Sequence, residues 1–349
     1  MIRYNNDYNR GAHPKILEAL QRTNGESYGG YGIDPWCEKA AQEILKYTDC
    51  PQAAVHFLVG GTQANFTVIA AALRPYQSVI SADSGHIHVH ETGAVEHTGH
   101  KITVLPSKNG KITARQVAET AESYRVSDIR EHVSQPKMVY LSYPTEYGTL
   151  YSLRELEEIS AVCREYGLYL FVDGARLGYG LGSAQADVTM KDLARLTDVF
   201  YCGGTKCGAL FGEALVIVNP ALKTDFRSYI KQNGAMLAKG WLLGLQFYTL
   251  FQDGLYFEIT KKADEYAMQI KEAFEEAGIP FYIESYTNQQ FVVLPDDIME
   301  ELGKRYIFEF EKKIDDTHSC VRFCTSWATK QEEADALAED IRRIAQEKN

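Results

Sequence analysis

The chain reads SLRELEEISAVCREYGLYLFVDGAR from residue 152 to residue 176, and this order predicts a helix followed by a buried strand. Ser152 and Glu155 form a capping-box pattern, in which each side chain satisfies a free N–H group at the start of a helix. Apolar residues then recur at helical spacing, and Gly167 suits the position just after a helix end. The apolar run at 168–172 follows at once and reads as a strand buried on both faces. The segment is therefore typical of one helix–strand unit of an α/β protein.

The same alternation of strand-like and helix-like segments extends from about residue 55 to residue 220. A helix is predicted at 62–73, and the apolar runs that we interpret as further strands lie at 56–59, 78–81, 101–105, 138–142, 198–202 and 214–218. Strands that are apolar throughout, with helices between them, favour a mainly parallel sheet covered on both faces. In such sheets ligands bind beyond the carboxyl ends of the strands. Polar residues directly after each apolar run are therefore the candidates for chemistry.

The pattern changes near residue 250, which predicts two closely packed domains in this chain of 349 residues. Residues 1–250 form the predicted large domain, and residues 251–349 form a smaller α+β domain. The smaller domain begins with a long predicted helix at 256–277 and ends with a charged helix from Lys330. Between these helices lie strand-like runs at 290–294, 307–310 and 320–324.

Composition narrows the classes of protein to which the chain can belong. The net charge of −11 argues against non-specific binding to nucleic acid. No apolar run approaches the roughly 18 residues that span a bilayer, and residues 1–10 lack the apolar core of a secretion signal. The seven cysteines follow neither a disulfide spacing nor a metal-site spacing. We therefore expect a cytoplasmic protein with no nucleic-acid or membrane partner.

Two polar features follow the first predicted strands. Gly60, Gly61 and Thr62 precede a helix, where backbone N–H groups can bind an anion, although these residues also suit an ordinary tight turn. Residues 83–91 read DSGHIHVHE, so the histidines would share one face if the segment were a strand. A metal site is conceivable there. Alternating histidines are more often surface, capping or core residues, or one of them could stack on a planar cofactor, so we predict no metal site.

Two charged residues follow later strands. Asp173 comes directly after the run at 168–172, and its carboxylate could cap the next helix or keep a pyridine ring nitrogen protonated. Lys206 lies in the segment YCGGTKCG, residues 201–208, where it could also be an exposed loop lysine. An anion-binding turn, a histidine, an aspartate and a lysine, in this order within one α/β domain, are the layout that a site for pyridoxal phosphate (PLP) requires.

These motifs resemble those of the L-threonine aldolase and β-eliminating lyase group of fold-type I PLP enzymes. The resemblance extends from the region of Tyr31 to Arg322, and its most specific motifs are GTQAN (61–65), DGAR (173–176) and GGTK (203–206). It implies an aspartate aminotransferase-like α/β fold with a mainly parallel, seven-stranded sheet in the large domain. It also implies a carbon–carbon lyase that cleaves L-threonine, L-allo-threonine or a related β-hydroxy amino acid to glycine and an aldehyde.

The resemblance implies roles for residues around the cofactor. Lys206 would carry PLP as a Schiff base, Asp173 would pair with the ring nitrogen, and His86 would stack on the ring. Arg176 would lie beside the cofactor. The phosphate would be held by Gly61, Thr62 and Thr205.

The resemblance also implies how a small amino-acid substrate is bound. Arg176 and Arg322 would bind the substrate carboxylate, because the guanidinium fork matches a carboxylate in geometry and charge. Asn6, where the family has a serine, and Tyr31 would complete the substrate site. Sites in this family are completed by a second subunit, which implies a homodimer or homotetramer. Tyr31 and Lys239 are the candidates for residues that reach the partner.

One departure from the family pattern leaves the reaction open. Where many aldolases have Thr-His-Asn, this chain has Thr145, Glu146 and Tyr147, so Glu146 replaces a histidine linked to the substrate hydroxyl. Its carboxylate could act as the catalytic base or could mark a different side-chain specificity. The alternative reactions are β-elimination or transamination of another small amino acid. The alternative from another class is a metal hydrolase or a histidine-rich binding protein.

Overall fold

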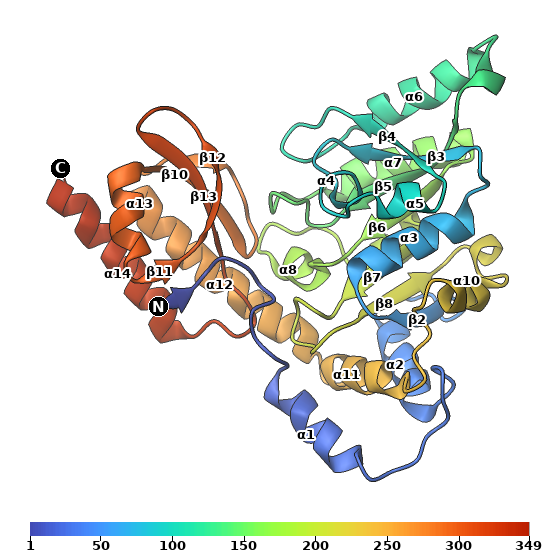
Figure 1. Ribbon diagram of the computed structural model, residues 1–349, viewed down its shortest axis with the longest axis horizontal. Helices are drawn as coiled ribbons and strands as arrows, with labels where there is room; N and C mark the ends of the chain where they lie inside the picture. The colour runs from blue at the N-terminus through green and yellow to red at the C-terminus, as the bar shows by residue number, and fades with distance from the viewer. Residues whose placement is uncertain (349) are drawn as a thin grey trace.

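A computed structural model describes residues 1–348 of the chain. Its larger part contains a seven-stranded sheet, here called the large sheet, with the strand order β2-β8-β7-β6-β5-β3-β4 (Figure 1). The strands are β2 (Ala54–Leu58), β3 (Gln77–Ala82), β4 (Lys101–Leu105), β5 (Gln135–Ser142), β6 (Tyr169–Asp173), β7 (Val199–Gly203) and β8 (Glu213–Ile217). Strand β8 is antiparallel to β2 and β7, and every other pair of neighbours is parallel. The prediction of a mainly parallel, seven-stranded sheet is confirmed.

Helices cover both faces of the large sheet, because successive apolar residues of a strand point to opposite sides. Val79 packs in the core on one face, and Ile80 packs in the core on the other. The first layer contains α3 (Gly61–Ala72), α5 (Ala94–His97) and α10 (Phe226–Gln232). The second contains α1 (Pro14–Thr23), α2 (Pro35–Lys46), α6 (Ala114–Val126), α7 (Leu153–Tyr166), α9 (Met190–Leu196) and α11 (Trp241–Phe251). In the part of the chain that the structure describes, no helix has the length and hydropathy of a membrane span.

Helix α7 and strand β6 form the helix–strand unit that the segment 152–176 predicts. The Ser152 hydroxyl accepts a hydrogen bond from the Glu155 N–H group, and the Glu155 carboxylate accepts one from the Ser152 N–H group. Gly167 follows the helix with a φ of 65°, a left-handed conformation that glycine adopts at little cost. This unit places Asp173 at the end of a buried central strand.

The segment with alternating histidines is a short helix rather than a strand. Helix α4 (His86–Val89) begins after Gly85, and the His86 and His90 rings lie 5.4 Å apart between centroids. A strand-like alternation over so few residues does not distinguish a strand from one helical turn. Within residues 1–348, the His, Cys, Asp and Glu side chains form no cluster of three or more that could hold a metal ion. The other short helices are α8 (Leu177–Gly182), η1 (Arg130–His132) and η2 (Pro220–Leu222).

The C-terminal part contains a four-stranded antiparallel sheet, here called the small sheet, in the order β12-β13-β10-β9. Its strands are β9 (Phe281–Ile283), β10 (Gln289–Pro295), β12 (Glu309–Lys313) and β13 (His318–Cys324), and its helices are α12 (Leu255–Glu276), α13 (Asp296–Gly303) and α14 (Gln331–Lys348). The single strand predicted at 307–310 is wrong. The run is divided between β11 (Tyr306–Ile307) and β12, because β11 pairs with the N-terminal strand and β12 pairs with β13.

The N-terminal residues pack with this C-terminal part (Figure 1). Strand β1 (Ile2–Arg3) runs parallel to β11, and Tyr4 belongs to the same apolar core as α12, α14, β10 and β13. Helix α12 contacts α8 at one end and α14 farther along, so it connects the two parts. The division of the chain near residue 250 stays a prediction, and we propose that residues 2–4 be grouped with the C-terminal part.

Candidate active site

A cavity of about 360 Å³ lies at the carboxyl edge of the large sheet, where the sequence analysis expects a ligand. Segments that follow β2, β5, β6 and β7 all reach it. Its lining includes most of the predicted site residues, namely Gly61, Thr62, His86, Glu146, Asp173, Arg176, Thr205 and Lys206. Predicted site residues as far apart in the sequence as Gly61 and Lys206 therefore share one cavity.

Lys206 follows β7 and lies among charged groups in the interior of the site. Burial and the positive charge of Arg176 lower the pKa of the Lys206 ammonium, against the opposing influence of Asp7 and Asp173. The Tyr179 hydroxyl donates a 2.6 Å hydrogen bond to the Lys206 carbonyl oxygen, which holds the backbone of this loop. A lowered pKa increases the fraction of neutral amine, which is the nucleophilic form of lysine.

Asp173 is a buried carboxylate with several hydrogen-bond donors. Tyr140 and Asn65 donate to Oδ2 at 2.5 and 2.9 Å, and the Ala175 N–H group donates to Oδ1 at 2.9 Å. Burial disfavours the charged form, but the neighbouring His86 and these hydrogen bonds outweigh it and lower the Asp173 pKa. Helix α8 begins after Arg176, so Asp173 is not its N-cap residue. The site therefore contains an ionised carboxylate at the end of β6.

A chain of hydrogen bonds connects Asp173 with the predicted stacking histidine. The Asn65 amide also donates to Glu91 Oε1 at 2.7 Å, and that oxygen lies 2.8 Å from His86 Nδ1. The Glu91 side chain has no exposed surface. Glu91 therefore fixes the orientation of the His86 ring, because a carboxylate bonded to one ring nitrogen restrains the imidazole.

Asn65, Glu91 and Tyr140 also belong to this site, although we predicted no role for them from the sequence. Asn65 lies within helix α3 and Tyr140 within strand β5, where a polar side chain has no distinctive spacing. One signal was available, because Asn65 and Glu91 lie in segments that already contained candidate residues. Only the packing of α3 against the sheet shows that they touch.

The Gly60–Thr62 turn forms one end of the cavity. Gly60 precedes α3 with no side-chain cap, so the first N–H groups of this 12-residue helix are free to bind an anion. A Cβ atom at Gly61 would come within 3.0 Å of the Tyr201 hydroxyl, so glycine permits this close approach. Thr205 is already engaged, because its hydroxyl donates to Glu213 Oε1 at 3.0 Å.

Glu146 lies in the loop after β5 and points into the same cavity. Its Oε1 atom accepts hydrogen bonds from the Ser142 hydroxyl at 2.6 Å and from the His86 N–H group at 2.8 Å. Burial raises the Glu146 pKa, and the Asp173 charge adds to the effect, against these hydrogen bonds. A carboxylate with a raised pKa is a better proton acceptor near neutral pH.

The Arg176 fork is occupied by a carboxylate of the same chain. Arg176 donates through Nε and Nη2 to the two oxygens of Asp7, at 2.7 and 3.0 Å. Asn288 adds a 2.9 Å hydrogen bond to Asp7. Arg176 therefore joins the N-terminal segment to the large sheet, and only its remaining N–H groups are left for a ligand.

Arg322 is held much more loosely on β13 of the small sheet. Its Nη atoms lie 3.4 Å from Gln289 Oε1 and 3.3 Å from the Asn5 carbonyl oxygen. Glu311 is 3.5 Å from Nε, yet Nε is buried without a hydrogen bond of acceptable geometry. Arg322 is not among the residues that line the cavity.

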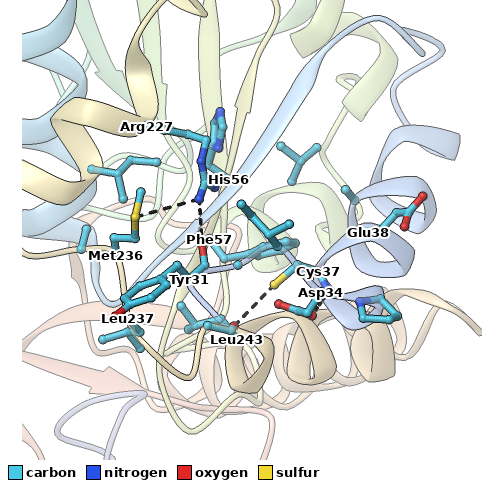
Figure 2. Close-up of a pocket in the computed structure, with 18 residues that line it drawn as sticks. Tyr31, Asp34, Cys37, Glu38, His56, Phe57, Arg227, Met236, Leu237 and Leu243 are labelled. Carbon is cyan, nitrogen blue, oxygen red and sulfur yellow. Dashed lines mark hydrogen bonds between the residues drawn. The ribbon is translucent and has the colours of Figure 1, made fainter. Parts of the chain in front are cut away.

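Two further predicted residues lie outside the cavity. The Asn6 side chain accepts a 3.2 Å hydrogen bond from the Tyr8 N–H group, and Tyr8, not Asn6, lines the cavity. Tyr31 borders a second cavity of about 500 Å³ together with Leu237 and Arg227 (Figure 2). There the Arg227 guanidinium donates to the Tyr31 carbonyl oxygen at 2.9 Å. Within one chain, the structure does not bring Tyr31 to the Lys206 cavity.

The chain is similar to known proteins in sequence and in fold. The profile of the beta-eliminating lyase family matches residues 14–297. The chain is 32% identical over 346 residues to a low specificity L-threonine aldolase of Pseudomonas aeruginosa, covering 96% of this chain and 95% of the relative. It is similar to the structure of Leishmania major threonine aldolase, with a TM-score of 0.96 and 44% identity, covering 99% of this chain and 100% of the other. A mutant aspartate aminotransferase of Thermus thermophilus shares the fold, with a TM-score of 0.71 at 14% identity, covering 99% of this chain and 91% of the other.

Proposed function

The chain belongs to the beta-eliminating lyase family, and we propose that it is a PLP-dependent carbon–carbon lyase that cleaves L-threonine, L-allo-threonine or a related β-hydroxy amino acid to glycine and an aldehyde. Members of this family use PLP, and its threonine aldolases act on amino acids. The observation that carries the proposal is the meeting of Lys206, Asp173 and the Gly61–Thr62 turn in one cavity.

The residues around the cavity fit PLP. Its volume of about 360 Å³ is in the range of small-ligand sites. Lys206 offers an amine with a lowered pKa, Asp173 offers an ionised carboxylate for a protonated ring nitrogen, and the start of α3 offers N–H groups for a phosphate. When bound, PLP withdraws electrons from the Cα atom of an attached amino acid and weakens the bonds at that atom.

We assign the cofactor contacts to the large sheet and to the loops that follow its strands. Asp173 would keep the ring nitrogen protonated, because its pKa is lowered and its Oδ2 atom accepts hydrogen bonds from Tyr140 and Asn65. His86 would stack on the ring, and Glu91 would keep the imidazole in that orientation through its hydrogen bond with Nδ1. Asp173 and His86 would therefore hold the cofactor before any substrate binds.

We assign recognition of the substrate carboxylate to Arg322. Its hydrogen bonds of 3.3 and 3.4 Å are long for a guanidinium, and a carboxylate would provide shorter, charge-assisted ones. Arg176 contributes less than the family resemblance implies, because Asp7 already accepts two of its N–H groups. Its role is to hold the site wall in position.

We assign the proton transfer to Glu146. As the Cα–Cβ bond breaks, the β-hydroxyl group must lose its proton, and Glu146 is a carboxylate in the cavity whose pKa is raised by burial. The Ser142 hydroxyl and the His86 N–H group both bond to Oε1, so they fix the carboxylate and leave Oε2 for the substrate. A carboxylate can thus replace the histidine of other aldolases.

Incubation with L-threonine tests the proposal. We expect equimolar glycine and acetaldehyde, measured by amino-acid analysis and by an alcohol dehydrogenase assay for the aldehyde. The Lys206→Ala variant serves as the control for contaminating enzymes. Release of ammonia and a keto acid in place of glycine would show β-elimination and would overturn the aldolase assignment.

We further propose that the protein is a homodimer or homotetramer in the cytosol. Tyr31 is 48% exposed and Ile33 is 70% exposed, and both border the second cavity, which a partner subunit could cover. Lys239 lies nearby on the exposed connection before α11. The seven cysteines are buried and unpaired within the described residues, which suits a reducing compartment. Gel filtration that finds full activity in a 39.3 kDa species alone would contradict the oligomer.

A further inference from the structure

A buried carboxyl group that the proposed chemistry does not use lies at the phosphate end of the cavity. Glu213 is only 2% exposed, yet it lines the cavity. It is the first residue of β8 and reads in the sequence as the start of an apolar strand. A carboxylate in this position is unexpected, because the neighbouring turn is built to attract an anion.

The register of the large sheet explains how Glu213 reaches this position. Strand β8 lies between β2 and β7 and is antiparallel to both. Glu213 pairs with Leu58 on one side and with Gly203 on the other. Leu58 comes two residues before Gly60, and Gly203 comes two residues before Thr205. Glu213 therefore lies between the two segments that we expect to hold the phosphate.

Glu213 accepts hydrogen bonds from one of these segments. The Gly204 N–H group donates to Oε2 at 3.2 Å, and the Thr205 hydroxyl donates to Oε1 at 3.0 Å. The Gly212 N–H group in turn donates to the Thr205 hydroxyl at 3.1 Å. While Thr205 donates to Glu213, its proton is not available to a phosphate oxygen.

We propose that Glu213 holds the phosphate of PLP as a neutral carboxylic acid, so that one proton on Glu213 accompanies cofactor binding. In this form, the O–H group of Glu213 donates to a phosphate oxygen, or it donates to Thr205 and frees the Thr205 proton for the phosphate. An ionised Glu213 would instead repel the phosphate and retain the Thr205 proton. The inference rests on the proposed function, because it concerns how that cofactor is bound.

The surroundings of Glu213 favour its neutral form. Burial raises the pKa of Glu213, and the charge of Asp173 acts in the same direction, whereas Lys206 and the two hydrogen bonds oppose it. The titratable side chains around Glu213 are Lys206, Asp173, Tyr201, Cys202 and Cys207. Burial raises the pKa of the tyrosine and of both thiols, so near neutral pH they bring no negative charge.

The direction of the pH dependence follows from the bound proton. Phosphate binds the protonated form of Glu213, so PLP affinity is highest below the Glu213 pKa and falls as the pH rises through it. Because one proton is involved, the dissociation constant should rise by about tenfold per pH unit above that point. Pyridoxal, which lacks the phosphate, should not show this contribution.

The experiment measures the dissociation constants of PLP and pyridoxal for the full-length protein by equilibrium dialysis at pH 6 to pH 10. The ratio of the two constants cancels the ionisation of Lys206, which affects both ligands. For the wild-type chain, we expect the preference for PLP over pyridoxal to fall as the pH rises. Glu213→Gln keeps a hydrogen-bond donor without a titrating proton, so its preference for PLP should not fall in this way as the pH rises.

Three results would count against the inference. Equal pH dependence of the ratio in the wild type and in Glu213→Gln would assign the titration to the phosphate itself and overturn the role of Glu213. The glutamine variant must fold, as judged by its circular dichroism melt. If it does not, the wild type alone decides: a ratio of the PLP and pyridoxal dissociation constants that stays constant above pH 7 would overturn the role of Glu213. A wild-type chain that binds no PLP at any pH would overturn both the inference and the proposed function.

Discussion

The two arginines that the family resemblance assigns to the substrate carboxylate are similarly buried but very differently bonded. The Arg176 side chain is 14% exposed and the Arg322 side chain is 20% exposed. Arg176, beside the large sheet, forms a two-pronged ion pair with Asp7. Arg322, on the small sheet, has only long contacts and a buried Nε without a hydrogen bond. Burial alone therefore does not distinguish a structural cation from one that is available to a ligand.

The same contrast separates the two sides of the site. On the large-sheet side, Asp173 and Glu91 are connected through Asn65, so their positions are set before a ligand binds. On the small-sheet side, Arg322 makes only long hydrogen bonds, which a substrate carboxylate could replace. We therefore expect changes on the large-sheet side to affect kcat or folding, and changes on the small-sheet side to affect KM.

Replacing Lys206 is the largest change to the large-sheet side. We expect Lys206→Ala to lower kcat by about 10⁴-fold or more, because a covalent catalytic residue is lost. Steady-state kinetics with L-threonine measure the effect, and circular dichroism checks the fold. Activity within tenfold of the wild type would show that another residue carries the cofactor.

Replacing Glu146 tests the proposed catalytic base on the large-sheet side of the site. We expect Glu146→Gln to lower kcat by roughly 10² to 10⁴-fold, which is the usual contribution of a general base. The base must be ionised, so wild-type kcat should fall as the pH drops through the Glu146 pKa, which lies above its ordinary value of 4.5. The pH–rate profile of the glutamine variant should lack this acid limb.

Ser142→Ala is the matched control for Glu146. The Ser142 hydroxyl stabilises the ionised carboxylate, so its loss should move the acid limb to higher pH while the maximum rate changes little. An acid limb that stays in Glu146→Gln, or that does not move in Ser142→Ala, would assign the proton transfer to another group.

Breaking the ion pair of Arg176 should affect folding more than binding. We expect Arg176→Ala to lower the free energy of unfolding by about 3–5 kcal/mol in urea titrations, because Asp7 is left buried without its partner. The double variant Asp7→Leu and Arg176→Met should regain most of that stability. A large rise in KM with unchanged stability in Arg176→Ala would mean that Arg176 binds substrate, as Arg322 is proposed to do.

The ion pair should also make stability depend on pH. Asp7 is buried, but Arg176 lowers its pKa below the ordinary value of 3.8. A carboxylate with a lowered pKa in the folded state stabilises the protein above its unfolded pKa, and this stability is lost as the pH falls through the folded value. Urea titrations between pH 5 and pH 3 should show this loss in the wild type and not in the double variant.

Replacing Arg322 should have a smaller effect than replacing Lys206 or Glu146 and should be seen in KM. We expect Arg322→Ala to raise KM for L-threonine by about 10- to 100-fold, which corresponds to the roughly 1.5–3 kcal/mol of hydrogen bonds to a charged group. Arg322→Lys should be intermediate, because lysine keeps the charge but not the fork. Arg343→Ala, an exposed arginine on α14, is the matched control. An unchanged KM in Arg322→Ala would show that the carboxylate binds elsewhere.

Much of the fold could be predicted because local signals determine it. The capping box at Ser152 and the apolar run at Lys101–Leu105 are visible in short windows of sequence. Strand direction is not a local property, so β8 could not be recognised as antiparallel. The split between β11 and β12 depends on β1, about 300 residues earlier in the chain (306 − 2 = 304).

The site residues that lie in sequence motifs could be predicted. Those that reach the site only through tertiary packing could not. Lys206, Asp173 and His86 lie in recognisable motifs, and the structure brings them to one cavity. Glu213 gave no signal, because a single polar residue at a strand start is common. The pairing of Arg176 with Asp7 joins residues 169 positions apart, and only tertiary structure could show it.

The most direct test of the account is to identify the lysine that binds PLP. The purified full-length protein is incubated with PLP, reduced with borohydride, digested and analysed by mass spectrometry. We expect one pyridoxyl group, on the peptide that contains Lys206. A pyridoxyl group on another lysine, or none on any lysine, would contradict the assignment of this cavity as the active site.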